Sequence, residues 1–221
     1  MRFSDILMGA AQGGGKITTP VAVTFLSNSA AGSGDLGTLT LGVGLIVIAV
    51  DQLYITGANP TVSGITINGV SATRLAGATG TAAGTDETVE IWAAACVAAS
   101  GNVTVTWNGS PLRGGYGLWL VTNSTGAAYA TGTDTGDTPS TTLNVPAKGA
   151  IIGAGANVVG TTATTWTGLT TEDYDELVGG ANTYHSGAHQ LFAAAVTPQT
   201  VSNDNTGTSG VAMACVSFAP A

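Results

Sequence analysis

The sequence predicts an all-β fold, an antiparallel two-sheet β-sandwich of jelly-roll type preceded by a short helical or extended arm. Charged residues are only 8% of the 221 residues while glycine occurs 33 times, a composition typical of short strands joined by tight turns. Short apolar or alternating segments recur at the spacing of a sandwich. Parallel strands need crossover connections of about a dozen residues or more, usually helical, and no such helix pattern is evident, so the sheets should be antiparallel.

We expect two parts: an attachment arm over residues 1–20 and one β-sandwich domain over residues 21–221. Ser4 is placed to cap a short helix over residues 5–11, and the glycines at 13–15 then act as a hinge. A small apolar helix beyond a flexible linker favours docking on a partner subunit, with docking on its own domain as the alternative. The arm residues expected to bind the partner are Phe3, Ile6, Leu7 and Met8.

The first half of the domain contains the segment around which the chain is organised. Alternation over residues 21–27 predicts the first strand, and residues 29–37 read as a loop. Leu45 to Val50 is a run of six apolar residues rich in β-branching, which predicts an interior strand covered on both faces. Asn68-Gly69 between residues 65–67 and 70–72 predicts a hairpin, because a two-residue turn needs positive φ twice.

The later segments complete a count of roughly ten to twelve strands. Residues 88–95 and 102–107 are expected to form a pair of strands, and residues 116–122 a second interior strand. A polar loop is expected over residues 125–138, and a helical turn over residues 171–177. The remaining strands are predicted at 141–145, 151–154, 183–185, 191–196 and 211–218.

The charge of the chain excludes some partners. The formal charge is −8, and the five basic residues are scattered, whereas nucleic acids and anionic membranes are bound by grouped Lys and Arg. We therefore expect neither as a partner. A weakly charged surface has little to oppose burial against neighbouring subunits, which favours a homo-oligomer. Residues 1–11 lack the apolar core of a secretion signal, so folding in the cytosol is expected.

Candidate chemistry is sparse. His185 and His189 are four residues apart, with Asp173, Asp175 and Glu176 upstream, but the sequence between the histidines reads as a turn and no metal site is predicted. The G-x-G-x-x-G match at residues 32–37 precedes a strand pattern rather than a helix, so no nucleotide or other cofactor is expected. Cys96 and Cys215 lie in apolar runs and are expected to be buried free thiols, with a disulfide as the alternative.

Two functional alternatives remain open at this point. Trp166, Tyr174 and Tyr184 could contact a glycan by stacking on sugar rings, which would suit a glycan-binding module of a fibre or adhesin. Carboxylates near Asp173 could serve a glycoside hydrolase. No serine elbow G-x-S-x-G is present, no catalytic residues are assigned, and we expect the protein not to be an enzyme.

Several motifs resemble those of small β-rich virion proteins of tailed bacteriophages. They are Ile-Thr-Ile-Asn-Gly-Val-Ser-Ala from residue 65, Gly-Leu-Trp-Leu-Val from 117, Leu-Asn-Val-Pro-Ala from 143, Trp-Thr-Gly-Leu from 166 with Glu-Asp-Tyr-Asp from 172, and Val-Ser-Phe-Ala-Pro from 216. The resemblance covers about residues 20–221. It implies a virion structural protein, such as a capsid decoration or cement protein, a head fibre or a tail accessory, made in the host cytoplasm and bound to a major capsid protein or tail component.

Overall fold

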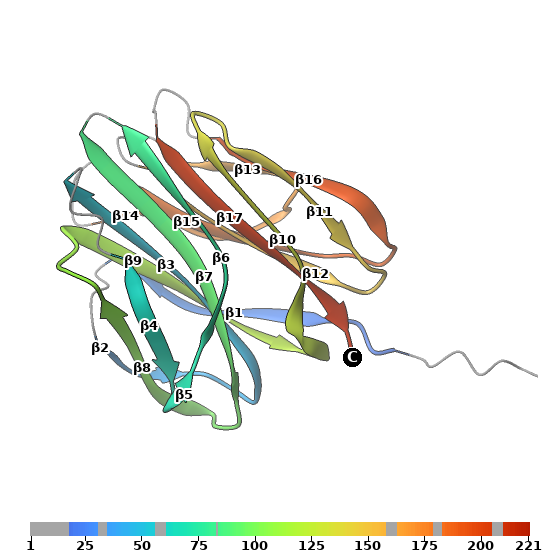
Figure 1. Cartoon of the computed structure of the whole chain (residues 1–221). Coiled ribbons are helices and arrows are strands. Elements are labelled where there is room, and N and C mark those ends of the chain that lie inside the picture. Colours follow the sequence, from blue (N-terminus) through green and yellow to red (C-terminus); the bar gives the residue numbers. More distant parts are fainter. Residues whose placement is uncertain are drawn as a thin grey trace, which may run out of the picture.

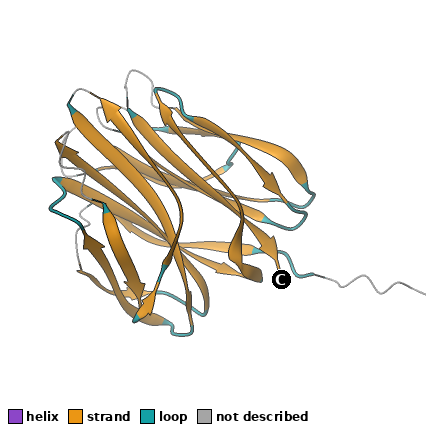
Figure 2. Cartoon of the chain, in the orientation of Figure 1, coloured by secondary structure: helices purple, strands orange, loops and turns teal. Residues whose placement is uncertain are grey.

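The structure is a computed structural model, and it describes residues 18–30, 35–55, 61–82, 84–157, 163–178, 183–204 and 210–221. Within these ranges all regular structure is β-strand, and every strand pairing is antiparallel (Figure 2). No helix long and apolar enough to cross a bilayer occurs in the described part of the chain. The predicted all-β, antiparallel sandwich class is confirmed. The expected helix at residues 5–11 lies outside the described residues.

Two sheets come from the first half of the chain. The first inner sheet has the order β1-β9-β3-β7-β6, and the first outer sheet has the order β2-β8-β4-β5. The strands of the inner sheet are β1 (Ala22–Ser29), β3 (Gly44–Ile55), β6 (Thr73–Ala82), β7 (Thr85–Cys96) and β9 (Arg113–Thr122). Those of the outer sheet are β2 (Asp35–Thr40), β4 (Val62–Ile67), β5 (Val70–Ser71) and β8 (Ser100–Trp107).

Two further sheets come from the second half. The second inner sheet has the order β10-β17-β12-β15-β14, and the second outer sheet has the order β11-β16-β13. The inner strands are β10 (Ser124–Gly136), β12 (Ala150–Ala156), β14 (Thr171–Leu177), β15 (Tyr184–Leu191) and β17 (Val211–Pro220). The outer strands are β11 (Ser140–Val145), β13 (Thr165–Thr167) and β16 (Val196–Asp204). The described chain is thus four stacked sheets, where the sequence predicted two (Figure 1).

Three apolar layers separate the four sheets, and the alternation along β3 shows why. Ile46 and Ile48 pack with Ile67 and Val103 of the first outer sheet, while Val47 and Ala49 pack with residues of the second inner sheet such as Ile152. Both faces of β3 are therefore covered, as the apolar run over residues 45–50 predicted. A third layer, which includes Ile151 and Trp166, fills the space between the second inner and second outer sheets.

The two halves of the chain repeat one topology. Taken in chain order, β10 to β17 alternate between inner and outer sheet in the same way as β1, β2, β3, β4, β6, β7, β8 and β9. The spatial orders also correspond, because β10-β17-β12-β15-β14 is β1-β9-β3-β7-β6 with each strand replaced by its counterpart. Only β5 has no counterpart among the described strands. The chain is therefore built as two sandwiches of the same design.

The inner sheets meet in an exchanged, two-fold-like arrangement. β6 lies against β10, and Tyr174 of β14, the counterpart of β6, packs on Phe25 of β1, the counterpart of β10. β7 contacts β17 and β12, and β9, which corresponds to β17, contacts β15, the counterpart of β7. β3 contacts its own counterpart β12 at the centre. The central strands of each inner sheet, such as β3, β12 and β17, are consequently buried on both faces, between their own outer sheet and the other sandwich.

Local predictions were confirmed where turn chemistry was explicit. The hairpin of β4 and β5 turns at Asn68 and Gly69, whose φ angles are 49° and 77°. The segment 125–138 was predicted to be a loop and is instead strand β10, paired with β17. The predicted helical turn at 171–177 is strand β14, and β7 and β8 lie in different sheets rather than forming a pair.

Candidate functional site

The residues predicted to contact glycans do not form a common surface. Trp166 is 8% exposed, and its indole lies in the apolar layer between the second inner and second outer sheets. Tyr174 is also 8% exposed and packs on the opposite face of the second inner sheet, between the two sandwiches. Tyr184 is half-buried in β15. Because a buried ring cannot present its face to a sugar, the expectation for Trp166 and Tyr174 is corrected: both are core residues.

The two histidines lie within one strand, β15, and the residues between them form no turn. Residues 186–188 belong to β15, which pairs with β12 on one side and β14 on the other. Residues four apart in a strand share a face and are separated by about 13 Å. His185 and His189 both face the first sandwich, but each has its own carboxylate partner, so they do not converge on one point.

His185 pairs with Asp51 across the contact between the sandwiches. Its Nδ1 lies 2.9 Å from the Oδ1 of Asp51 in β3, and both side chains are at least 96% buried. Gly115 of β9 leaves the space for this pair, since a Cβ there would lie 2.6 Å from the imidazole. The sequence prediction ended the core strand at Val50 and so missed Asp51, although Leu53 and Tyr54 beyond it continue the apolar character of the strand.

His189 belongs to a second polar group at the same contact. Its Nδ1 lies 2.8 Å from Oδ2 of Asp173 in β14, and the indole Nε1–H of Trp119 donates a 2.7 Å hydrogen bond to that oxygen. Trp119 comes from β9 of the first sandwich, so this carboxylate accepts a hydrogen bond from the opposite sandwich. The carboxylate considered for hydrolysis is therefore engaged in holding the two sandwiches together.

An aromatic cluster lies between the two polar groups. Tyr174 contacts Phe25, Trp119 and His185, with ring centroids 5.7, 5.8 and 4.9 Å apart respectively. Gly117 in β9 and Gly187 in β15 make this possible, since a Cβ at either position would lie within 2.5 Å of the Tyr174 ring. Gly117 and Gly187 are thus sites where an aromatic ring lies directly on the backbone.

Burial and neighbouring charges shift several pKa values at and near this contact in one direction. Burial raises the pKa of Glu87 well above its ordinary value, the nearby Asp51 raises it further, and Arg113 opposes the shift. Burial also raises the pKa of Asp175 to about 6, against the hydrogen bond from the backbone N–H of Thr164. These carboxyl groups retain their protons to higher pH than free ones.

His185 is shifted in the same direction by a balance of opposing causes. Burial by itself lowers the pKa of His185, but Asp51 with its hydrogen bond, and then Glu176 and Asp175, raise it by more. His185 therefore holds a second proton to higher pH than a free histidine. A protonated imidazole beside Asp51 forms a charge-assisted hydrogen bond between the sandwiches.

The polar side chains at this contact bind and orient one another, and their hydrogen bonds hold the two sandwiches together. The Nε2 of His185 lies 4.0 Å from the Glu176 carboxylate, and no serine or cysteine is hydrogen-bonded to it among the described residues. No group of three or more His, Cys, Asp or Glu side chains placed to hold a metal ion was found in the same part of the chain. Cys96 and Cys215 are buried free thiols, as expected.

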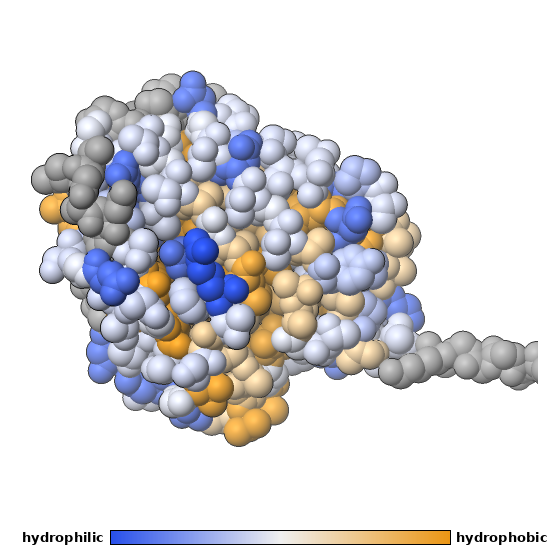
Figure 3. Space-filling view, viewed as in Figure 1, coloured by the Kyte–Doolittle hydropathy of each residue, from blue (hydrophilic) through white to orange (hydrophobic). Residues whose placement is uncertain are grey.

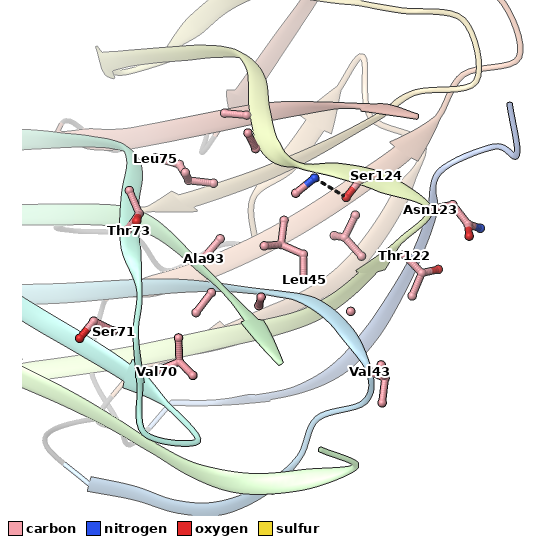
Figure 4. A pocket seen from close by; sticks show the side chains of 17 residues that line it. Val43, Leu45, Val70, Ser71, Thr73, Leu75, Ala93, Thr122, Asn123 and Ser124 are labelled. Carbon is pink, nitrogen blue, oxygen red and sulfur yellow. Dashed lines mark hydrogen bonds between the residues drawn. The ribbon is translucent and has the colours of Figure 1, made fainter. Parts of the chain in front are cut away.

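An apolar groove of about 690 Å³ opens at the end of the first inner sheet where β3 begins and β7 ends (Figure 4). None of its lining side chains is charged. They come from the start of β3, from β5 and β6, from the end of β7 and from the junction of β9 with β10: Val43, Gly44, Leu45, Val70, Ser71, Thr73, Leu75, Ala93, Ala94, Ala95, Val121, Thr122, Asn123, Ser124, Gly126, Ala127 and Ala128. Apolar surface also gathers between the centre and lower edge of the face in Figure 3.

The expected arm residues Phe3, Ile6, Leu7 and Met8 lie outside the described residues. No protein-family model, curated protein or solved structure matches this chain.

Proposed function

We propose that this chain is a non-enzymatic structural protein of a tailed-bacteriophage virion, of the capsid decoration, cement or head-fibre type. It assembles with copies of itself and is attached through its first 16 residues to a major capsid protein or a tail component. It is made in the host cytoplasm and resides in the virion.

The observation that carries the proposal is the strand order of the two sandwiches. In each, an inner order such as β1-β9-β3-β7 faces an outer order such as β2-β8-β4, and consecutive strands alternate between the sheets through β4. This strand order matches that of a jelly roll, an architecture used by viral capsid proteins and lectins, and so supports the jelly-roll assignment. We infer that the chain is a tandem pair of jelly rolls.

The use of the reactive side chains supports a structural role. Both histidines and their partners Asp51 and Asp173 lie at the contact between the sandwiches, where they join β3, β9, β14 and β15. The groups that could suggest hydrolysis thus contribute to cohesion of the molecule. The glycan alternative lacks a comparable observation, since Trp166 and Tyr174 are core residues.

The attachment role of residues 1–16 is supported by how firmly the chain is held immediately after them. The ammonium group of Lys148 donates a 2.8 Å hydrogen bond to the carbonyl of Thr18, and the Val21 N–H donates one of 2.9 Å to the carbonyl of Lys148. Asn123 donates a further hydrogen bond to the carbonyl of Pro20. A force applied to the arm would therefore act on the whole sandwich stack.

Incorporation into particles tests the proposal. Replacing Phe3, Ile6, Leu7 and Met8 together by serine should leave a folded protein that no longer co-purifies with particles, because the apolar contacts of the arm are lost. Gln12→Ser in the same segment is the matched control and should be incorporated like the wild type. Normal incorporation of the fourfold variant, or failure of the wild type to join particles, would contradict the proposal.

A further inference from the structure

The apolar groove at the end of the first inner sheet has the chemistry and the place of a receptor for the N-terminal segment. Val43 is 65% exposed and Val70 46% exposed at its border, and Val97, 85% exposed, follows the end of β7. Exposed aliphatic side chains gathered beside a groove indicate a surface that is covered in the working assembly. The lining contains no charged group and is mostly Val, Leu, Ala and Gly, which favours an occupant rich in apolar side chains.

The backbone at the groove is open to an incoming segment. β6 pairs with β7 as far as Ala93 and then passes into β5, which belongs to the outer sheet, so residues 94–96 pair only with β3 among the described strands. On the other side, β10 pairs with β17 at Ser124 and resumes at Ala128, leaving residues 125–127 outside the ladder. Unpaired strand edges of this kind accept an extended peptide.

The N-terminal segment joins the rest of the chain beside this groove. Asn123 lines the groove, and its side-chain amide donates a 3.2 Å hydrogen bond to the carbonyl of Pro20. Met8 lies ten positions before Thr18, and a chain of that length spans up to about 33 Å. Phe3, Ile6, Leu7 and Met8 are therefore within reach of the groove of their own chain or of a neighbouring copy. Four of the six residues from Phe3 to Met8 are apolar, and Asp5 is the only charged one.

We propose that the groove is the docking site for Phe3 to Met8 of this chain. This inference rests on the proposed function, in which residues 1–16 attach the subunit, and adds the surface that receives them. Occupied by the segment of a neighbouring copy, the groove joins subunits, and occupied by its own segment, it stores the arm before assembly.

Cross-linking of the purified full-length protein tests the docking site. Met8→Cys is combined with Ala127→Cys in the groove, or with Leu191→Cys as the control, and a short bismaleimide is added. Leu191 is 51% exposed and does not line the groove. It pairs with Ala150, close to Lys148, whose ammonium group is hydrogen-bonded to the carbonyl of Thr18. Cys96 and Cys215 are buried and stay out of the reaction.

The groove pair should cross-link at least about tenfold faster than the control pair, the ratio expected for a preference of about 1.4 kcal/mol. Adding Ile6→Asp and Leu7→Asp should reduce the groove pair to the control rate. A monomer-sized product identifies the chain's own groove and a dimer-sized product that of a neighbour, and either supports the docking site. Equal rates for the two pairs, or a groove rate that the aspartates do not change, would overturn it.

The two proposals fail in different experiments. If the groove pair is not favoured but the fourfold serine variant still loses incorporation, the arm attaches the subunit and binds elsewhere. If the groove pair is favoured in solution but the wild type does not join particles, the docking site holds and the virion role falls.

Discussion

Individual glycines decide whether the two sandwiches can meet. Gly115, Gly117 and Gly187 lie in the inner strands, where His185 and Tyr174 press their rings onto the backbone. These glycines are extended residues in which the missing side chain, rather than an unusual φ, is required. The sequence shows glycines throughout the chain, and only the packed structure identifies those that admit a ring.

Gly117→Ala should destabilise the protein by about 1–3 kcal/mol, the usual cost of inserting a methyl group into a packed core. The added Cβ would overlap the Tyr174 ring, which is itself held by Phe25, Trp119 and His185. Gly64→Ala in β4 is the matched control, because no atom lies within 4 Å of the position that its methyl group would take. Urea denaturation measures both, and an equal effect of the two substitutions would contradict this account.

At the scale of elements, the reliability of a sequence prediction follows from the kind of signal. The Asn68-Gly69 hairpin and the interior strands β3 and β9 were predicted because turn stereochemistry and two-sided burial act locally. β10 was missed because its Gly, Ala and Asp residues are depleted in strands, and its strand conformation comes from pairing with β17. β14 was missed for the same reason, its partner being β15.

The β4–β5 hairpin allows the turn stereochemistry to be tested. Gly69 has φ of 77°, and nothing lies within 4 Å of the place a Cβ would occupy there. Gly69→Val should therefore cost about 1–2 kcal/mol through backbone strain alone, because an L-residue pays that much in the left-handed region. Asn68→Gly is the control and should be nearly neutral, since glycine accepts positive φ freely. A valine variant with the wild-type denaturation midpoint would show that the turn has a different geometry.

At the scale of the whole molecule, stability depends on pH through groups at and near the contact between the sandwiches. The pKa values of Glu87, Asp175 and His185 are all raised in the folded protein. A raised pKa means that the folded state binds more protons than the unfolded state, so the stabilisation is complete below the unfolded pKa and is lost as pH rises through the folded one. For Asp175 the window runs from about 3.9 to about 6. The stabilisation that His185 contributes is lost as the pH rises above about 6.5, and that of Glu87 as it rises above about 4.3.

The melting temperature should consequently fall as the pH is raised from 5 to 8. The net charge of −8 acts in the same direction, because self-repulsion grows as the remaining carboxyl groups ionise. Differential scanning calorimetry of wild type and His185→Gln checks the cause. Above about pH 6.5 the melting temperature of the variant should fall less steeply than that of the wild type, because the contribution of His185 is removed, whatever its absolute stability. A melting temperature that rises from pH 5 to 8 would contradict the assignment.

The sequence by itself determined that the chain is all-β, antiparallel and built around two interior strands, because glycine-rich turns, alternation and apolar runs act over a few residues. Only the tertiary structure decided that there are four sheets and two sandwiches of one topology. It also decided that Trp166 and Tyr174 are core residues and that the histidines pair with Asp51 and Asp173. These features depend on which strands meet across about 100 residues of chain, and local preference does not encode that pairing.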